Sequence, residues 1–254
     1  MDRKIDITKN KEYYKKKRNN ILFFVFGPFF IVVSIYLALT QFSNIDKNVI
    51  LNIVLPIIIV NVFFVIKTTN KSLYYNMKYL YYRMKEDQLG IVNIKKKLFT
   101  KKWLNDFLVE GYKLARETTS YIIYYRFPEK LKMNRQKNDI LECVIVAKVK
   151  SLDFYSEEID KEIDQILIHN NRFKQTKKIV VLQYKRYEAF SESTEKDIDS
   201  IICFSNRFHF LVNVTVGYFE KDNQVYFLTP KTKYPNKYYY YACQQIKKQV
   251  GMIE

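Results

Sequence analysis

Residues 21–42 read ILFFVFGPFFIVVSIYLALTQF, and residues 49–66 read VILNIVLPIIIVNVFFVI. Neither stretch contains a charged side chain, and only six residues separate them. An α-helix rises 1.5 Å per residue, so the first stretch can cross a hydrocarbon core of about 30 Å and the second just reaches across it. A core helix of a soluble protein normally keeps a polar stripe. The sequence therefore predicts a transmembrane hairpin of two helices over residues 21–66.

A cleaved signal peptide is the other class of segment that places an apolar run near an N-terminus. The apolar core of such a peptide is short, about 7–15 residues, and a small-x-small cleavage site follows it. Residues 21–42 form a longer run, and no such site follows at the right distance. We therefore expect the first helix to be retained as an anchor.

Lysine and arginine cluster on both outer flanks of the hairpin, whereas the loop 43–48 holds only Lys47, next to Asp46. Cationic flanks stay on the cytoplasmic side of a membrane. The sequence therefore predicts a multi-pass protein of the cell membrane with both termini in the cytoplasm. Anionic lipid headgroups would attract the nearest flanking cations. The residues predicted to make this contact are Lys15, Lys16, Lys17, Arg18, Lys67 and Lys71.

Two amides interrupt the second apolar stretch, at Asn52 and Asn61. An amide is tolerated within lipid where it faces another helix, because it can form hydrogen bonds there. We therefore predict that Asn52 and Asn61 make helix–helix contacts in the membrane, within the hairpin or in a self-associated form.

The rest of the chain divides into three further segments. Residues 1–20 form a basic cytoplasmic segment, and residues 67–88 form an amphipathic juxtamembrane helix with apolar residues at helical spacing. This helix either continues the second span or lies on the membrane surface. Residues 89–254 predict a cytoplasmic α+β domain with a mixed or antiparallel sheet, in the element order β, α, β, β, α, β, α, β, β, α.

Local signals set several element boundaries in this domain. Ser156 is placed to cap one helix, and Thr194 with Asp197 predicts a capping pair before a helix through residues 198–202. Residues 208–216 alternate apolar with other side chains, which predicts a half-buried strand. Gly111 is placed to end a short helix, and Gly251 to end the last one.

The composition limits the chemistry. The chain has 254 residues, a net charge of +17 and only five glycines, which are scattered, so phosphate-binding glycine loops are absent from the sequence. The three cysteines and two histidines have no metal-ligand spacing. We predict no cofactor, no metal and no catalytic set. The positive charge would suit nucleic acid or anionic lipid, and its position beside the spans favours lipid. The Lys-, Ile-, Asn- and Tyr-rich composition is typical of an AT-rich bacterial genome.

One short stretch bears on an enzymatic alternative. The run Gln183-Tyr184-Lys185 at the end of an aliphatic strand resembles the QxK variant of restriction-endonuclease-like nucleases, over about seven residues. Those nucleases carry an acid on the preceding strand, because a divalent metal needs oxygen ligands. Here a helix separates the strand from the nearest acids, Asp139 and Glu142, so the resemblance departs at the essential acid.

Basic and aromatic side chains interleave at two further places, and we predict from them a partner-binding face. Its residues are Lys185, Arg186, Tyr187, Tyr238 and Tyr239. Such side chains suit a protein or lipid contact, and tyrosines can also stack on bases.

Three functions fit these expectations. The first is a non-catalytic component of a membrane-associated assembly, of the secretion or conjugation kind, which docks other membrane proteins or itself. The second is a membrane-disrupting effector with a sensing domain, as in antiviral defence. The third is a membrane-tethered nuclease.

Overall fold

The computed structural model of the chain forms two compact units, residues 1–86 and residues 87–254. Each unit is described by itself. The structure describes residues 2–42, 47–128, 140–153, 156–199, 202–205 and 209–252.

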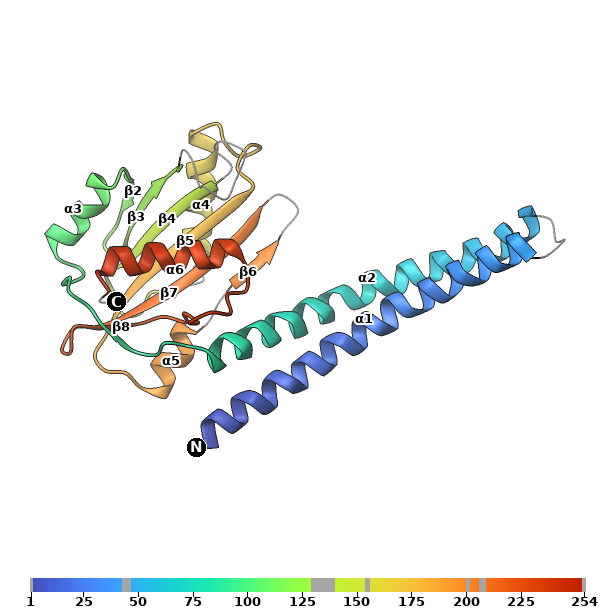
Figure 1. Cartoon of the computed structure of the whole chain (residues 1–254). Coiled ribbons are helices and arrows are strands. Elements are labelled where there is room, and N and C mark those ends of the chain that lie inside the picture. Colours follow the sequence, from blue (N-terminus) through green and yellow to red (C-terminus); the bar gives the residue numbers. More distant parts are fainter. Residues whose placement is uncertain are drawn as a thin grey trace. The chain divides into compact units, whose positions relative to one another are not determined.

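The first unit is a hairpin of two long helices, α1 (Asp2–Phe42) and α2 (Lys47–Glu86) (Figure 1). At 1.5 Å per residue, helices of 41 and 40 residues each extend for about 60 Å. The basic segment 1–20 is therefore helical and continuous with the first apolar stretch. Residues 67–86 continue the second stretch in the same helix, which decides between the two arrangements that the sequence left open.

The two helices are antiparallel, and the chemistry of their contact changes along the hairpin. Toward Phe42 and Lys47, aliphatic side chains meet, and Ile50 and Val54 are buried, as is Val25 farther back along α1. At the other end, residues 2–20 of α1 run beside residues 67–86 of α2, and we call this paired segment the stalk. There the rings of Tyr14 and Tyr82 stack at 5.5 Å, and Lys11 Nζ lies 2.7 Å from Glu86 Oε1.

The second unit contains a mixed β-sheet, which is one of the two kinds of sheet that the sequence predicted. Its strands follow the order β1-β8-β7-β5-β4-β3-β2, and β6 pairs with β7 beside this path. The pairs β4–β5 and β5–β7 are parallel, and the other pairs are antiparallel. The strands are β1 (Val92–Asn93), β2 (Lys113–Glu117), β3 (Tyr121–Arg126), β4 (Ile140–Ala147), β5 (Lys178–Tyr187), β6 (Ile202–Ser205), β7 (Phe210–Phe219) and β8 (Gln224–Tyr226).

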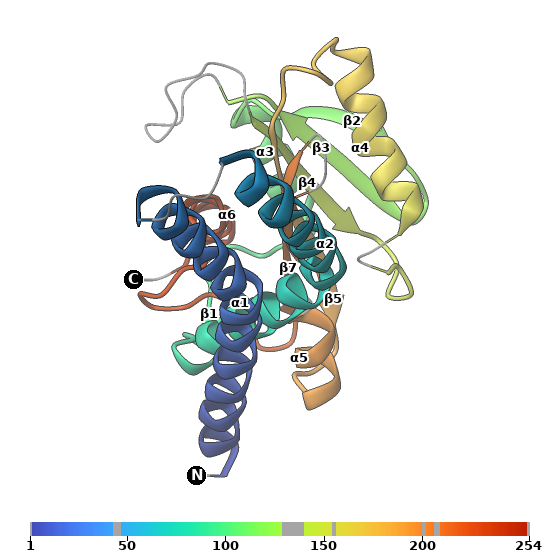
Figure 2. The same ribbon diagram turned by 90° about the vertical axis from the view of Figure 1, so that its right-hand side faces the viewer.

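Helices cover both faces of this sheet (Figures 1 and 2). They are α3 (Lys101–Val109), α4 (Glu157–His169), α5 (Glu192–Ile198) and α6 (Lys237–Val250). The apolar stripe of α4 buries Ile159, Ile163 and Leu167 against β3, β4 and β5. On the opposite face lie α6 and α3, where the ring of Trp103 meets that of Tyr184 at 5.2 Å. The central strands are thus shielded from water on both sides.

Two predicted boundaries are confirmed at glycines, and one predicted cap is wrong. Gly111 and Gly251 follow the ends of α3 and α6 with φ of +84° and +64°, the left-handed region that glycine adopts at low cost. The cap of α5 is Ser191, which accepts a hydrogen bond from the N–H of Thr194 in a capping box. Asp197 instead lies within that helix, because α5 begins earlier than the sequence indicated.

Three strands differ from the expectation. The strand β7 is buried on both faces rather than one, because α6 covers one side and α5 the other. Residues 202–205 form β6 rather than the end of a helix. The sequence analysis also missed β2, which is exposed along its whole length at the edge of the sheet. Its pairing with β3 is shifted by an irregularity between Leu114 and Arg116.

Candidate functional site

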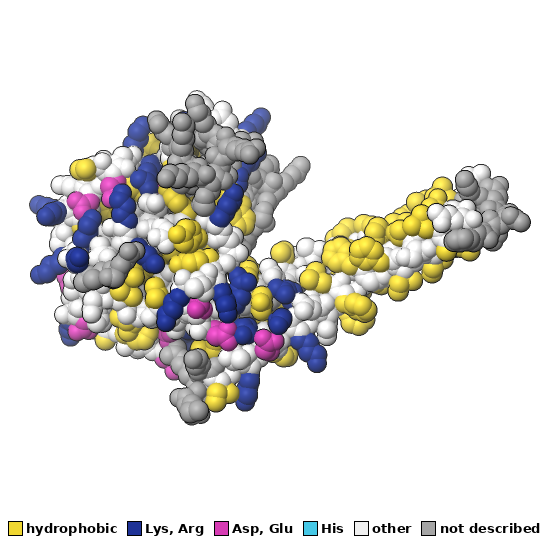
Figure 3. All heavy atoms as spheres, viewed as in Figure 1, with side chains coloured by type: hydrophobic (Ala, Val, Ile, Leu, Met, Phe, Trp, Pro, Cys, Tyr) yellow, Lys and Arg dark blue, Asp and Glu magenta, His cyan; other side chains and the backbone are white. Residues whose placement is uncertain are grey.

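The apolar stretches of the hairpin keep their side chains on the outside. Phe23, Phe30, Val60 and Phe63 are each 65–73% exposed. In the most apolar 18-residue windows of the two helices, only 6% and 12% of the residues are buried. Figure 3 shows hydrophobic side chains covering this part of the hairpin. A core helix of a soluble protein is mostly buried, whereas these two helices are long and apolar enough to cross a membrane.

The six cations predicted to meet lipid headgroups lie on both helices beside the apolar stretches. We call them the basic collar, and they are Lys15, Lys16, Lys17 and Arg18 on α1 and Lys67 and Lys71 on α2. Most of the collar is exposed, and the guanidinium of Arg18 lies 4.3 Å from the ring centre of Tyr79 across the stalk. In the antiparallel pairing Arg18 lies opposite Tyr79, so Lys71 and Lys67 lie roughly 12 and 18 Å farther along the hairpin, toward Lys47.

The two amides of the second apolar stretch have different surroundings. Asn52 is exposed, and Asn61 is half-buried. Ile50 and Val54 are buried four residues apart on one face of α2, so Asn52 between them points away from α1. The exposure of Asn52 leaves its amide open to a contact outside the hairpin. Its contact with a helix of another molecule stays a prediction.

The structure does not bring the predicted partner-binding residues onto one face, which corrects that grouping. The first three residues lie at the end of β5, whereas Tyr238 lies near its start, with its ring centre 5.8 Å from Lys178 Nζ. At about 3.3 Å per residue, seven residues of strand separate these places by roughly 23 Å. Tyr239 is fully buried, and its hydroxyl is satisfied there because it donates to the carbonyl of Leu228.

Lys185 and its neighbours are similarly held by their own domain. Lys185 is only 9% exposed, and its Nζ donates to Leu152 O at 3.1 Å and lies 3.4 Å from Asp197 Oδ2. The hydroxyl of Tyr187 also donates to Asp197. Arg186 alone of the predicted face is well exposed, with its guanidinium over the ring of Phe99 at 4.6 Å.

The residues of the short nuclease resemblance are also separated. In the parallel register Glu142 pairs with Val180, so it shares a face with Tyr184 and lies opposite Gln183 and Lys185. The other acid that was considered, Asp139, falls outside the described residues. The described part of the chain therefore does not join an acid of β4 to the Gln-x-Lys run.

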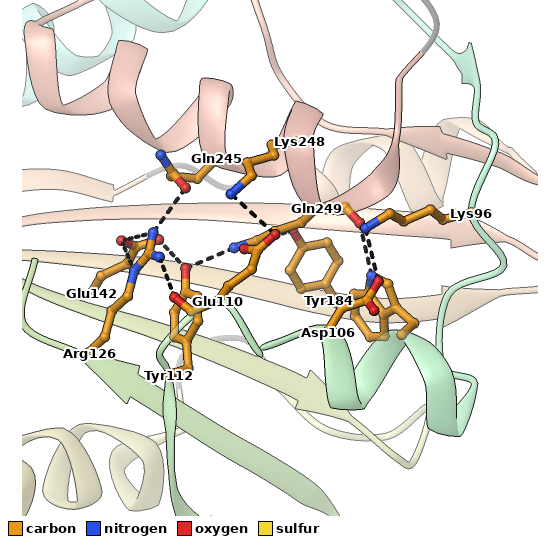
Figure 4. A network of polar contacts seen from close by, with 11 residues as sticks. Lys96, Asp106, Glu110, Tyr112, Arg126, Glu142, Tyr184, Gln245, Lys248 and Gln249 are labelled. Carbon is orange, nitrogen blue, oxygen red and sulfur yellow. Dashed lines mark hydrogen bonds and ion pairs between the residues drawn. The ribbon is translucent and has the colours of Figure 1, made fainter. Parts of the chain in front are cut away.

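A buried carboxylate instead anchors a polar network that the sequence analysis missed (Figure 4). Glu142 on β4 has no exposed surface. Arg126 on β3 donates from Nε to Glu142 Oε2 at 3.0 Å, and Tyr241 on α6 donates to the same oxygen at 2.7 Å. Tyr112 donates to Glu142 Oε1. A charge this deep is tolerated because an arginine and two hydroxyls satisfy it.

The network continues to the helices on this face of the sheet. Arg126 also donates to Glu110 O at 3.1 Å and to Gln245 Oε1 at 3.0 Å. Gln249 on α6 donates to the hydroxyl of Tyr112 at 2.9 Å and accepts from that of Tyr184. Burial, together with the charge of Glu142, raises the pKa of Tyr112 well above its usual value. The tyrosine therefore stays a neutral donor at physiological pH.

A cleft of about 580 Å³ opens beside this network. The ends of β3, α3 and α4, the start of β2, and α6 all contribute to its wall. Charged lining residues are Glu110, Lys113, Arg126 and Arg172, and polar ones include Asn170, Tyr241 and Gln245. The only sequence signal for this site was a single glutamate within an otherwise apolar strand, ILECVIVA.

No family model matches the chain, and neither the curated proteins nor the solved structures that were compared include a match.

Proposed function

We propose that the chain is an integral membrane protein that holds an α+β interaction domain at the cytoplasmic face of the cell membrane. In this proposal it is a non-catalytic component of a membrane-associated assembly, of the secretion or conjugation kind. The observation that carries the proposal is the exposure of the apolar windows, of which 6% and 12% of the residues are buried. Side chains such as Phe23 and Phe63 stabilise the hairpin only where an apolar phase surrounds them.

The basic collar supports the orientation. Each lysine or arginine near an anionic inner leaflet contributes about 1 kcal/mol of attraction. Because the hairpin is antiparallel, the collar residues of both helices would lie toward the same leaflet, with Lys67 and Lys71 placed deeper than Lys15–Arg18 and extending toward the headgroups. The stalk beyond the collar would then stand in the cytoplasm, where Lys11 and Glu86 form their ion pair in water.

Fractionation of cells tests the anchor directly. We expect the full chain to stay in the membrane pellet at high salt and alkaline pH, and to need detergent for extraction. Epitope tags at the two termini should both be cleaved by protease only when the cytoplasmic face is accessible. Recovery in the aqueous fraction, or tags on opposite faces, would contradict the proposal.

The assembly role needs a separate experiment. Purification in mild detergent should recover other membrane proteins of fixed identity with the chain. The exposed Arg186 offers a probe of the contact, and Arg186→Glu should weaken that recovery, whereas Lys174→Glu at another exposed position should not. Recovery of the chain alone, after chemical crosslinking in cells, would speak against an assembly.

A second function, a membrane-disrupting effector with a sensing domain, is favoured by one specific observation. Asn52 presents an amide on the apolar outer surface of α2, where it is exposed and can bond to the same residue of another copy. Toxicity on overexpression that Asn52→Leu or Asn61→Leu abolishes would favour this role. Val62→Leu, an apolar exchange on the same helix, is the matched control.

A further inference from the structure

The cleft beside Arg126 has the size of a small-molecule site. Its volume of about 580 Å³ lies within the range of roughly 300–1,000 Å³ that ligand pockets occupy. Five separate elements form its wall, so its shape depends on the fold of the whole domain rather than on one loop. Aromatic rings of Tyr125, Phe127 and Tyr241 line it beside the charged residues.

The charges at the cleft do not balance. The charge of Arg126 is neutralised by Glu142, with Arg126 Nη2 2.9 Å from Glu142 Oε2. Glu110 is neutralised by Lys248, whose Nζ lies 3.3 Å from Glu110 Oε1. Two lining cations are then left over, Lys113 and Arg172, for which no carboxylate partner is found among the described residues.

Arg172 is positioned as a binding group. Its guanidinium lies 4.5 Å from the ring centre of Phe127, which holds the planar group in place. Its Nη1 is buried, and within the described ranges of the chain it has no hydrogen-bond acceptor. Leaving such a donor without an acceptor is unfavourable, and more so for a charged group. Nη1 itself is closed to the cleft, so an anion bound by this guanidinium would satisfy it only after a small shift of the side chain.

Glu110, in contrast to Arg172, needs a hydrogen-bond donor rather than an acceptor. Its Oε2 is buried and has no donor in the part of the chain that the structure describes. It lines the same cleft as Arg172. A ligand that fills the cleft would therefore carry an anionic group for the cations and a hydroxyl or amine that can donate to the Glu110 carboxylate once this side chain turns toward it.

We propose that this cleft binds a small phosphate monoester that also carries hydrogen-bond donors, such as a nucleoside monophosphate or a sugar phosphate. A phosphate monoester bears a charge of about −1.5 to −2 at pH 7, which matches the two uncompensated cations. Arginine binds phosphate through two parallel N–H bonds, and Lys113 adds a mobile charge. The ester's hydroxyls or base amine supply the donor for Glu110.

The test is calorimetric titration of the full chain in detergent with adenosine monophosphate, ribose 5-phosphate, inorganic phosphate and adenosine. We expect the two esters to bind, adenosine not to bind, and inorganic phosphate to bind at least tenfold more weakly than the esters. Arg172→Met should weaken ester binding at least tenfold, and Arg172→Lys should restore part of it. Lys174→Met, which removes a nearby exposed cation outside the cleft, should have no effect.

Fluorescence of Trp103, the chain's single tryptophan, separates loss of binding from loss of fold. Should Arg172→Met unfold the domain, Lys113→Met at an exposed position provides the second variant, with an expected loss of several-fold. Equal binding by wild type and folded variants, or no ester binding at millimolar concentration, overturns the proposal. Inorganic phosphate binding as tightly as the esters would reduce the site to an anion site and overturn the ligand class. Membrane fractionation has no bearing on any of these outcomes.

Discussion

The hairpin and the α+β domain use similar side chains in opposite ways. In the hairpin, aromatic residues such as Phe23 and Phe63 face outward, and most charged side chains of the stalk are at least partly exposed. In the domain, aromatic residues such as Tyr121 and Phe227 are buried, and so is the carboxylate of Glu142. The domain therefore suits water, because its large apolar side chains are buried and the carboxylate of Glu142 finds its partners within it. The apolar side chains of the hairpin are removed from water only where another apolar phase covers them.

The largest effect should come from the buried carboxylate. In Glu142→Leu, Arg126 loses its counter-charge, and the hydroxyls of Tyr112 and Tyr241 lose their acceptor. Breaking one partner of a buried ion pair typically costs about 3–5 kcal/mol. We expect the free energy of unfolding to fall by that amount, measured by urea denaturation of the full chain in detergent with Trp103 fluorescence.

The stalk provides the comparison for this measurement. Glu86→Leu removes the partner of Lys11, but this pair is partly exposed, and such pairs contribute only about 0–1 kcal/mol. The same Trp103 signal should hardly change. Equal losses in the free energy of unfolding for the two variants would contradict the argument that burial makes the interactions of Glu142 more stabilising.

Next in size is a charge placed on the outer surface of the hairpin. Val60 and Val109 are 68% and 87% exposed, the first on α2 and the second at the end of α3. An arginine at the centre of a membrane helix costs about 2.5–3.5 kcal/mol, whereas a surface arginine costs almost nothing in water. Val60→Arg should shift a large share of the chain out of the carbonate-resistant membrane pellet, and Val109→Arg should not. A similar distribution for both variants would mean that both valines face water.

The sequence predicted best where a single local rule decides the structure. Uncharged runs defined the apolar parts of both hairpin helices, and the glycines at 111 and 251 marked two helix ends, because each feature depends on a few adjacent residues. The strand β2 was missed since its sequence, KLARE, has no buried face to produce an alternating pattern. The strand β6 was missed because Ile202, its first residue, also fits helical spacing after Ile198.

The candidate site could not be predicted in the same way. Glu142, Arg126, Tyr112 and Tyr241 come from four separate elements, and only the pairing of strands and the docking of α6 bring them together. The predicted face around Lys185 and Tyr239 failed for the related reason that basic and aromatic residues look alike in sequence whether exposed or buried. An isolated acid in an apolar strand was the one usable signal.

Glycines give a third, smaller contrast between the units. A Cβ at Gly217 on β7 would lie 2.3 Å from Ile198 Cδ1, whereas nothing lies within 4 Å of a Cβ at Gly27 on α1. Overpacking of a tight core costs about 1–3 kcal/mol. Gly217→Ala should lower the urea midpoint of the Trp103 transition, and Ile198→Val should recover part of the loss. Gly27→Ala should leave membrane retention and the midpoint unchanged; a shift at Gly27 equal to that at Gly217 would contradict the packing argument.

The smallest effect concerns pH at the start of the domain. Partial burial alone would raise the pKa of Asp87, but N–H groups of Thr232 and Lys233 and the Thr232 hydroxyl donate to its carboxylate and hold its pKa below the usual value. A lowered pKa adds stability that is present above the unfolded-state pKa of about 3.9 and is lost as the pH falls below it.

Asp87→Asn should therefore reduce the stability of the domain by less than about 1 kcal/mol at pH 7, because the group is largely exposed. The difference from wild type should shrink between pH 4 and pH 2, and urea titrations of Trp103 fluorescence at each pH measure it. A difference that grows as the pH falls would reverse the sign and contradict the assignment.

The edge strand β2 has a consequence for proteins that are crowded in two dimensions. Its charged side chains, its offset against β3 and the ion pair between Arg116 and Glu162 leave no regular row of backbone groups for another strand to join. Chains held on one membrane meet one another far more often than chains in dilute solution. If the chain is anchored in a membrane as proposed, a sheet edge of this kind favours reversible association through side chains over irreversible strand-to-strand aggregation.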